Sequence, residues 1–99
     1  MPRYPANFYD PNGGFGACGI PLQNGDFTVA LGPGHWDGGF HCGQTVNVQY
    51  QGRTIQVVVQ ELCPGCQGAN GIDLSEGAIA ALDLNYLNDG VISVVWCFA

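Results

Sequence analysis

Two carboxylates stand where the sequence could support acid–base chemistry. Glu61 follows Val57 and Val59 on one side of an alternating segment, so it is expected at a strand end against apolar neighbours. Asp73 lies just before a predicted helix, where it could instead cap backbone N–H groups, and spacing alone favours that capping role. If the fold brings Glu61 and Asp73 together, the pair could act in general acid catalysis or bind sugar hydroxyls.

Cysteine is the other reactive residue type that the chain uses heavily, with five in 99 residues. The one tight pair is Cys63 and Cys66, and His35 and His41 lie well upstream of it. We therefore favour disulfides over a zinc site, and expect neither a metal nor another cofactor. Dense cysteines indicate a secreted protein, and we interpret residues 1–5, which lack an apolar core, as following a removed signal peptide. The odd count leaves at least one thiol free or paired between chains.

Charge and composition exclude several classes of function. The chain has two Lys plus Arg against eight Asp plus Glu, and this net charge of −6 argues against binding nucleic acid or anionic lipid. No apolar run reaches the roughly 20 residues that a membrane-spanning helix needs. With 46% hydrophobic residues the chain is not a disordered acidic tail, and 16 Gly with 6 Pro favour a turn-rich β domain. The 99 residues make one domain, residues 1–99.

The alternation of apolar and polar residues predicts the elements that would position these groups. The clearest is a β-hairpin over residues 44–60, with its turn at Gln51 and Gly52. Ser75 is an expected N-cap for a helix over residues 75–84. Six or so short strands and one or two short helices indicate a mainly β fold that closes into a small barrel. The other predicted strands cover residues 6–10, 26–31 and 91–98.

Three further residues have both a chemical and a structural interpretation. Trp36 lies in a glycine-rich loop over residues 32–39, where it could stack on a ligand or pack within the loop, with neither favoured. Trp96 shares its side of a strand with apolar residues, so we expect it in the core. Asp10 precedes a Pro in a turn sequence, and turn formation accounts for it fully.

Six short motifs occur along the chain in a fixed order: Ala6-Asn7-Phe8-Tyr9, Gly16-Ala17-Cys18-Gly19, Cys42-Gly43-Gln44-Thr45-Val46, Val59-Gln60-Glu61-Leu62-Cys63-Pro64-Gly65-Cys66, Ile72-Asp73-Leu74-Ser75 and Gly90-Val91-Ile92-Ser93-Val94-Val95-Trp96. Their order and spacing resemble the double-psi β-barrel superfamily of expansin, barwin and RlpA-like domains, and especially the small fungal loosenins. The resemblance covers residues 6–98. It implies a six-stranded double-psi barrel, secretion, an open groove that holds polysaccharide, and no second carbohydrate-binding domain.

The resemblance also assigns groove roles to individual residues. Asp73 matches the Asp of the family's Asp-Leu-Ser element, and Tyr9 matches its first-strand aromatic residue. Asn7 stands where expansins usually have Thr, and Glu61 stands in place of a shorter Asp. With Trp36 as a stacking platform, we expect these five residues to bind the glycan.

For the cysteines, the barwin-like pattern implies a disulfide between Cys18 and Cys42. Cys63 and Cys66 could then form a tight local disulfide, which leaves Cys97 unpaired. Because Cys97 lies in an apolar strand, we expect a buried, inert thiol. Pairing of Cys97 with Cys63 or Cys66 stays open.

The expected function is non-hydrolytic loosening of cell-wall polysaccharide, cellulose or chitin, by a secreted monomer. Neutral glycans are favoured because an acidic protein gains no attraction to anionic pectin. One alternative is an inverting endoglucanase similar to family-45 glycoside hydrolases, with Asp10 as base and Asp73 as acid. Another is a cysteine-protease inhibitor of the same superfamily, which would need a protruding loop such as residues 32–39.

Overall fold

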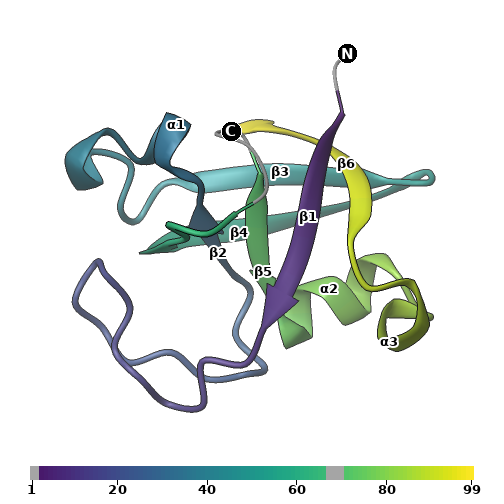
Figure 1. Ribbon diagram of the computed structural model, residues 1–99, viewed down its shortest axis with the longest axis horizontal. Coiled ribbons are helices and arrows are strands. Elements are labelled where there is room, and N and C mark those ends of the chain that lie inside the picture. Colours follow the sequence, from purple (N-terminus) through teal and green to yellow (C-terminus); the bar gives the residue numbers. More distant parts are fainter. Residues whose placement is uncertain (1–2, 67–70) are drawn as a thin grey trace.

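Six β-strands close into a barrel in the computed structural model, which describes residues 3–66 and 71–99 (Figure 1). The strand order around the barrel is β1-β5-β2-β4-β3-β6, and β6 pairs with β1 to close it. The pairs β1–β5 and β2–β4 are parallel and the other neighbours are antiparallel. The predicted mainly β, six-stranded barrel is confirmed. The elements are β1 (Tyr4–Tyr9), β2 (Thr28–Leu31), α1 (Pro33–Trp36), η1 (Asp37–Gly39), β3 (Thr45–Tyr50), β4 (Arg53–Leu62), β5 (Ile72–Ser75), α2 (Glu76–Leu82), α3 (Tyr86–Asp89) and β6 (Ile92–Phe98).

The hairpin of β3 and β4 forms where the alternation predicted it. Gln51 and Gly52 both have positive φ, 47° and 81°, as the tight type I′ turn between twisted strands requires. Val46 and Val57 pair directly across the hairpin and are fully buried. Strand β4 continues to Leu62, so it includes Glu61, which was predicted at the end of this strand. The bounds of β1, β2 and β6 fall within two residues of those predicted.

Apolar side chains from all six strands and α2 fill the barrel. Trp96 is only 7% exposed, so its predicted place in the core is confirmed. Burial of each large apolar side chain contributes about 1.5–3 kcal/mol to folding, which makes this core the main source of stability. The core cluster comprises Ala6, Val29, Leu31, Val46, Val48, Val57, Val59, Ile72, Leu74, Ala78, Ile79, Leu82, Ile92, Val94 and Trp96.

Strand β5 is the element that the sequence did not reveal. Its four residues are too few to show a period of two, and its partners β1 and β2 are distant in sequence. The helix after it, α2, has Ser75 at the N-cap position as predicted, and ends two residues early. The Ser75 hydroxyl does not cap α2, because it donates to the Asp26 carbonyl and accepts from the Thr28 N–H at 3.2 Å. Ser75 therefore ties β5 to the start of β2.

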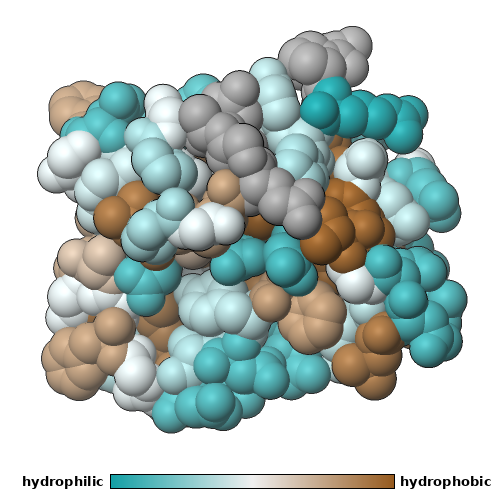
Figure 2. Space-filling model, in the orientation of Figure 1, coloured by the Kyte–Doolittle hydropathy of each residue, from teal (hydrophilic) through white to brown (hydrophobic). Residues whose placement is uncertain are grey.

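The surface in the view of Figure 2 is largely hydrophilic or neutral, with hydrophobic residues in small separate patches. Exposed hydrophobic residues scattered over a surface are ordinary on a folded domain. In the described parts of the chain, no helix is long and apolar enough to cross a membrane. The exposed large hydrophobic residues are Phe15, Ile20, Phe27, Phe40, Leu84, Leu87 and Val91.

Candidate functional site

The strand register lines up four polar or small residues across the sheet. Asn7 of β1 pairs with Asp73 of β5, and Asp73 pairs in turn with Ala30 of β2. Ala30 then pairs with Glu61 of β4. Neighbouring strands are about 4.8 Å apart, so the backbones of Asp73 and Glu61 are roughly 9.6 Å apart across the sheet. Ala30 stands between them and presents only a methyl group, which leaves space between the two acidic side chains.

That space belongs to a cavity of about 460 Å³. The cavity brings together the predicted glycan-binding residues with the exception of Trp36, and Asp10 also lies outside its lining. Ala30 was not predicted as a site residue, because its place between Asp73 and Glu61 comes only from the pairing of β2 with both β5 and β4. The lining residues are Pro5, Asn7, Tyr9, Ala30, Glu61, Leu62, Cys63, Pro64, Gly65, Cys66, Ile72, Asp73 and Val91.

Glu61 is held in place by a β-bulge and two backbone N–H groups. Val29 pairs with Val59 while Ala30 pairs with Glu61, so Gln60 is an extra residue in β4. Glu61 Oε1 accepts hydrogen bonds from Ala17 N–H at 2.6 Å and from the N–H of the following Leu62 at 3.1 Å. The carboxylate therefore anchors the loop before β2 as well as lining the cavity.

The loop before β2 reaches Glu61 because Gly16 has no side chain. A Cβ at Gly16 would approach the Gln60 carbonyl oxygen more closely than 3.0 Å and lie 2.9 Å from Leu22 Cδ1. With glycine there, Cys18 N–H donates to the same carbonyl at 3.2 Å, and the Cys18–Cys42 disulfide fastens the loop to the segment before β3. Gly16 thus permits the close packing that positions Glu61.

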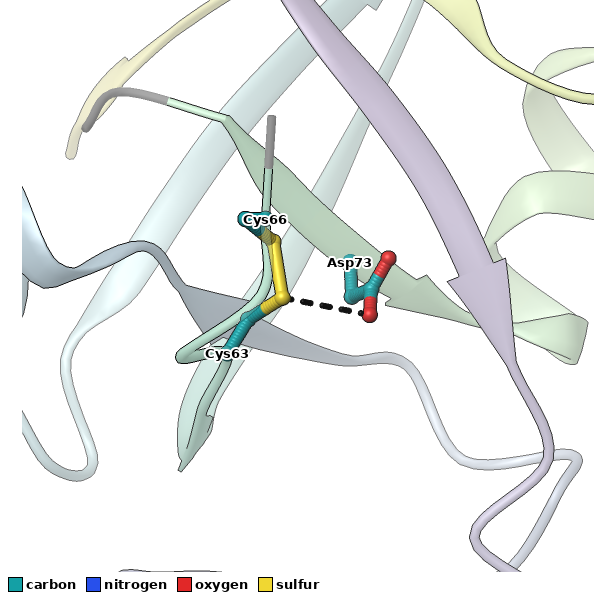
Figure 3. A group of neighbouring side chains, drawn as sticks. All are labelled: Cys63, Cys66 and Asp73. Carbon is teal, nitrogen blue, oxygen red and sulfur yellow. Dashed lines mark hydrogen bonds between the residues drawn. A yellow bond between two sulfur atoms is a disulfide. The ribbon is translucent and has the colours of Figure 1, made fainter. Parts of the chain in front are cut away.

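Asp73 is a strand residue and not a helix cap. It is the second residue of β5, and α2 begins after Ser75, so the capping role that spacing favoured does not hold. Its side chain is half-buried, and this burial raises the pKa of the carboxyl group. Oδ2 lies 3.3 Å from Sγ of Cys63, and Figure 3 shows the carboxyl group beside the Cys63–Cys66 disulfide. Asp73 is therefore protonated more readily than a carboxyl group in water.

Both predicted disulfides, Cys18–Cys42 and Cys63–Cys66, are present. Cys97 is free, so the alternative pairing with Cys63 or Cys66 is excluded. The expectation that Cys97 is buried was wrong, because the thiol is exposed. Side chains alternate along β6, and the residue before Cys97 points into the core, so Cys97 points outward.

One group of potential metal ligands lies in the described part of the chain. Sγ of Cys63, Sγ of Cys66 and a carboxylate oxygen of Asp73 all lie within 4.8 Å of one another. The two sulfurs are bonded to each other, so neither is the thiolate that zinc requires. In this disulfide form the three residues do not make a metal centre.

Tyr9 lines the cavity from the last position of β1. Burial raises the pKa of its phenol, the nearby Thr28 hydroxyl offsets part of that effect, and the charges of Glu61 and Asp73 add to it. The phenol is therefore neutral at physiological pH, and its ring is available as a flat apolar surface.

Asp10 and Trp36 lie apart from this cavity. Asp10 is exposed just after β1, and its pKa is raised by partial desolvation and by the negative charge of Glu76. The Asn12 side chain donates to the Asp10 carbonyl at 3.2 Å, which fits the predicted turn. Trp36 ends α1, is half-buried and packs against the core. The predicted loop over residues 32–39 thus contains α1 and η1.

His41 has specific partners that the sequence did not indicate. Its Nδ1 lies 2.7 Å from Gln44 Oε1, its Nε2 lies 2.9 Å from Asp37 Oδ2, and its ring stacks on Phe98 at 4.1 Å between centroids. The hydrogen bond with Gln44, followed by that with Asp37, raises the pKa of His41. When it is protonated, the His41 ring ties η1 to the barrel through Asp37 and Phe98.

Together, a closed six-stranded barrel with two parallel strand pairs and an acidic cavity across them define a double-psi β-barrel domain.

No protein-family model matches the chain. Comparison with curated proteins does find relatives. The papain inhibitor of Streptomyces mobaraensis is 35% identical over 98 residues, which cover 91% of this chain and 66% of that protein. Expansin-like protein 1 of Dictyostelium discoideum is 36% identical over 89 residues, which cover 78% of this chain and 30% of that protein. The chain thus spans about two thirds of the first relative and under a third of the second.

Solved structures agree with these relatives. The Streptomyces papain inhibitor superposes with a TM-score of 0.83 at 34% identity, covering 100% of this chain and 93% of that one. A mutant expansin of Clavibacter michiganensis, in complex with cellohexaose, superposes with a TM-score of 0.85 at 25% identity, covering 98% of this chain and 49% of that one. The chain belongs to the family of double-psi β-barrels that includes the Streptomyces papain inhibitor and expansin-like proteins.

Proposed function

We propose that the protein is secreted and binds cell-wall polysaccharide, cellulose or chitin, in the cavity above Ala30, loosening its packing without hydrolysis. The main support is the row of Asn7, Asp73 and Glu61 around that cavity, because carboxylates and amides are suitable partners for sugar hydroxyls. The solved complex of the Clavibacter michiganensis expansin with cellohexaose supports a glycan role for this fold. Two disulfides suit an oxidising compartment.

Each side chain has a distinct part in this proposal. Asp73 and the second oxygen of Glu61 accept hydrogen bonds from sugar hydroxyls. Asn7 Oδ1 already accepts from the Phe8 N–H at 2.9 Å, so its Nδ2 is the group left to donate to a sugar oxygen. The ring of Tyr9 offers a flat surface for stacking. Trp36 lies outside the cavity, so it would contact only a glycan chain that extends beyond it.

The distribution of carboxylates favours binding over cleavage. An inverting glycosidase needs an acid and a base on opposite sides of the bond, with room for water between them. Asp10, the candidate base, lies outside the cavity lining, and Glu61 Oε1 is occupied by two backbone N–H groups. We therefore propose that Asp73 binds hydroxyls and does not act as a catalytic acid.

A paired assay on cellulose and chitin tests this function. Protein bound to the insoluble polymer and reducing ends released into the supernatant are measured together. We expect binding without new reducing ends, and binding reduced at least tenfold in Asp73→Ala but unchanged in the matched control Asp10→Ala. Release of reducing ends that Asp73→Asn abolishes would instead make the protein an endoglucanase.

A second candidate function is inhibition of cysteine proteases. It is favoured by the identity of 34% to the Streptomyces papain inhibitor across 93% of that solved chain. An inhibitor would contact the protease through exposed loops, and Phe40 beside η1 is 75% exposed. If papain is inhibited, Phe40→Ala should weaken inhibition at least tenfold while Asp73→Asn leaves it unchanged. Inhibition with no binding to either polymer would replace the glycan proposal.

A further inference from the structure

The Cys63–Cys66 disulfide is placed where a small reagent can reach it. Both cysteines line the 460 Å³ cavity and are three residues apart. Cys18 and Cys42 are 24 residues apart and are not among the residues that line this cavity. A molecule that enters the cavity can therefore contact Cys63–Cys66 while the barrel stays folded.

The two sulfurs of this disulfide differ in their surroundings. Cys63 directly follows β4, is only 9% exposed, and donates its N–H to the Leu31 carbonyl at 2.8 Å. Cys66 is half-buried and follows the exposed residues Pro64 and Gly65. Exchange requires a thiolate to attack an accessible sulfur while the other sulfur leaves. Access therefore favours attack on Cys66 and departure of Cys63.

The leaving sulfur would be released beside a carboxyl group. Asp73 Oδ2 lies 3.3 Å from Cys63 Sγ, a distance at which a free thiol can donate a hydrogen bond to it (Figure 3). Tyr9 of β1 and Glu61 of β4 are the other titratable groups around the cavity. A thiolate at Cys63 is disfavoured by burial and by negative charge on Asp73 and Glu61, whereas the Tyr9 phenol is neutral. Because only a thiolate re-attacks a mixed disulfide, a protonated Cys63 closes the bridge slowly.

We propose that Cys63–Cys66 exchanges with low-molecular-weight thiols in the folded protein, with Cys66 as the attacked sulfur and Asp73 holding the released Cys63 as a thiol. The sulfur of the incoming thiol bonds to Cys66 Sγ. The Cys63–Cys66 bond breaks and its electron pair stays on Cys63, which takes up the proton that the incoming thiol lost. One disulfide replaces another, so no oxidant or reductant is consumed. The proposal does not rest on glycan binding being the function of the protein.

Excess glutathione applied to the folded protein tests the proposal, in a Cys97→Ser background that removes the free thiol. After alkylation, peptide mass mapping should find glutathione on Cys66 and the alkyl group on Cys63. The same map follows the Cys18–Cys42 bridge, whose two cysteines are both half-buried but do not line the cavity. Glutathione on Cys63, or reaction only on unfolding, would overturn the proposal.

The role of Asp73 has its own readout, the thiol pKa of Cys63 measured from the pH dependence of alkylation. Asp73→Asn should lower this pKa by at least one unit, which is a tenfold rise in thiolate fraction at fixed pH. The rate at which Cys63 closes the bridge again at fixed pH should rise, because more of it is thiolate. Asp10→Asn makes the same chemical change outside the cavity and should move neither quantity. Equal values for the two variants would remove Asp73 from the exchange.

Discussion

Replacing Gly16 with alanine tests how the loop before β2 positions Glu61. The added methyl group would meet the Gln60 carbonyl at less than 3.0 Å and Leu22 Cδ1 at 2.9 Å. Neither neighbour can move freely, because Gln60 belongs to β4 and Leu22 is 1% exposed. The loop must therefore move away from the strand.

The expected cost follows from the contacts that this movement breaks. The hydrogen bond from Ala17 N–H to Glu61 Oε1 has a charged acceptor and contributes about 1.5–3 kcal/mol, and that from Cys18 N–H to Gln60 contributes about 1 kcal/mol. Their loss predicts a free energy of unfolding lower by about 2.5–4 kcal/mol in Gly16→Ala. For a domain of this size, that corresponds to a melting temperature lower by at least about 10 °C.

Denaturant unfolding measures this effect against a matched control in the same loop. A methyl group added at Gly25 would meet no atom within 4 Å beyond its chain neighbours, and the φ of Gly25 is one that alanine adopts readily. Gly25→Ala should therefore change the free energy of unfolding by less than about 0.5 kcal/mol. Equal stability of Gly16→Ala and Gly25→Ala would refute the close packing between the loop and β4.

Three further predictions concern other parts of the molecule. Ala30→Leu should fill the floor of the cavity and reduce glycan binding at least tenfold with both carboxylates in place, and normal binding in a pull-down would move the site elsewhere. His41 stabilises the fold when protonated, because its folded pKa is raised. The stability difference between wild type and His41→Ala should therefore be full below the unfolded pKa of about 6.5 and shrink as pH rises through the folded value, as measured by unfolding between pH 5.5 and 8.5. Cys97→Ser should change the free energy of unfolding by less than about 0.5 kcal/mol relative to wild type, because Cys97 is exposed. For the same reason Cys97 should react with a thiol reagent in the folded wild type, and an unreactive thiol would contradict its exposure.

Much of the barrel could be predicted because its longest elements repeat a local pattern. The β3–β4 hairpin follows from alternating Val residues and a turn at Gln51 and Gly52 whose positive φ suits a tight connection. Strand β5 could not be predicted in the same way. It is four residues long, and its strand character comes from pairing on both sides with segments distant in sequence.

Site residues could be predicted where their chemical type marked them. They could not be predicted where their place depended on the register of the strands. Asp73 and Glu61 were identified from the family motifs, and the cavity brings them together. Ala30 was missed because its importance comes from standing between two strands that carry carboxylates. Cys97 was misplaced because an apolar strand has two faces, and only the register of β6 decides which one is buried. Trp36 could not be assigned because its packing depends on α1, a single helical turn without periodicity.

An amide NMR titration of the labelled protein, with cellohexaose and with the matching chitin hexamer, tests directly whether the cavity binds a glycan. We predict that one of these oligosaccharides shifts amide signals around the cavity, above all those of Asn7, Ala30, Glu61 and Asp73. Asp73→Ala should weaken the affinity for that oligosaccharide at least tenfold, which matches loss of a hydrogen bond to a charged group of about 1.5–3 kcal/mol. Shifts confined to residues 33–40, or no shifts with either oligosaccharide, would contradict glycan binding in the cavity.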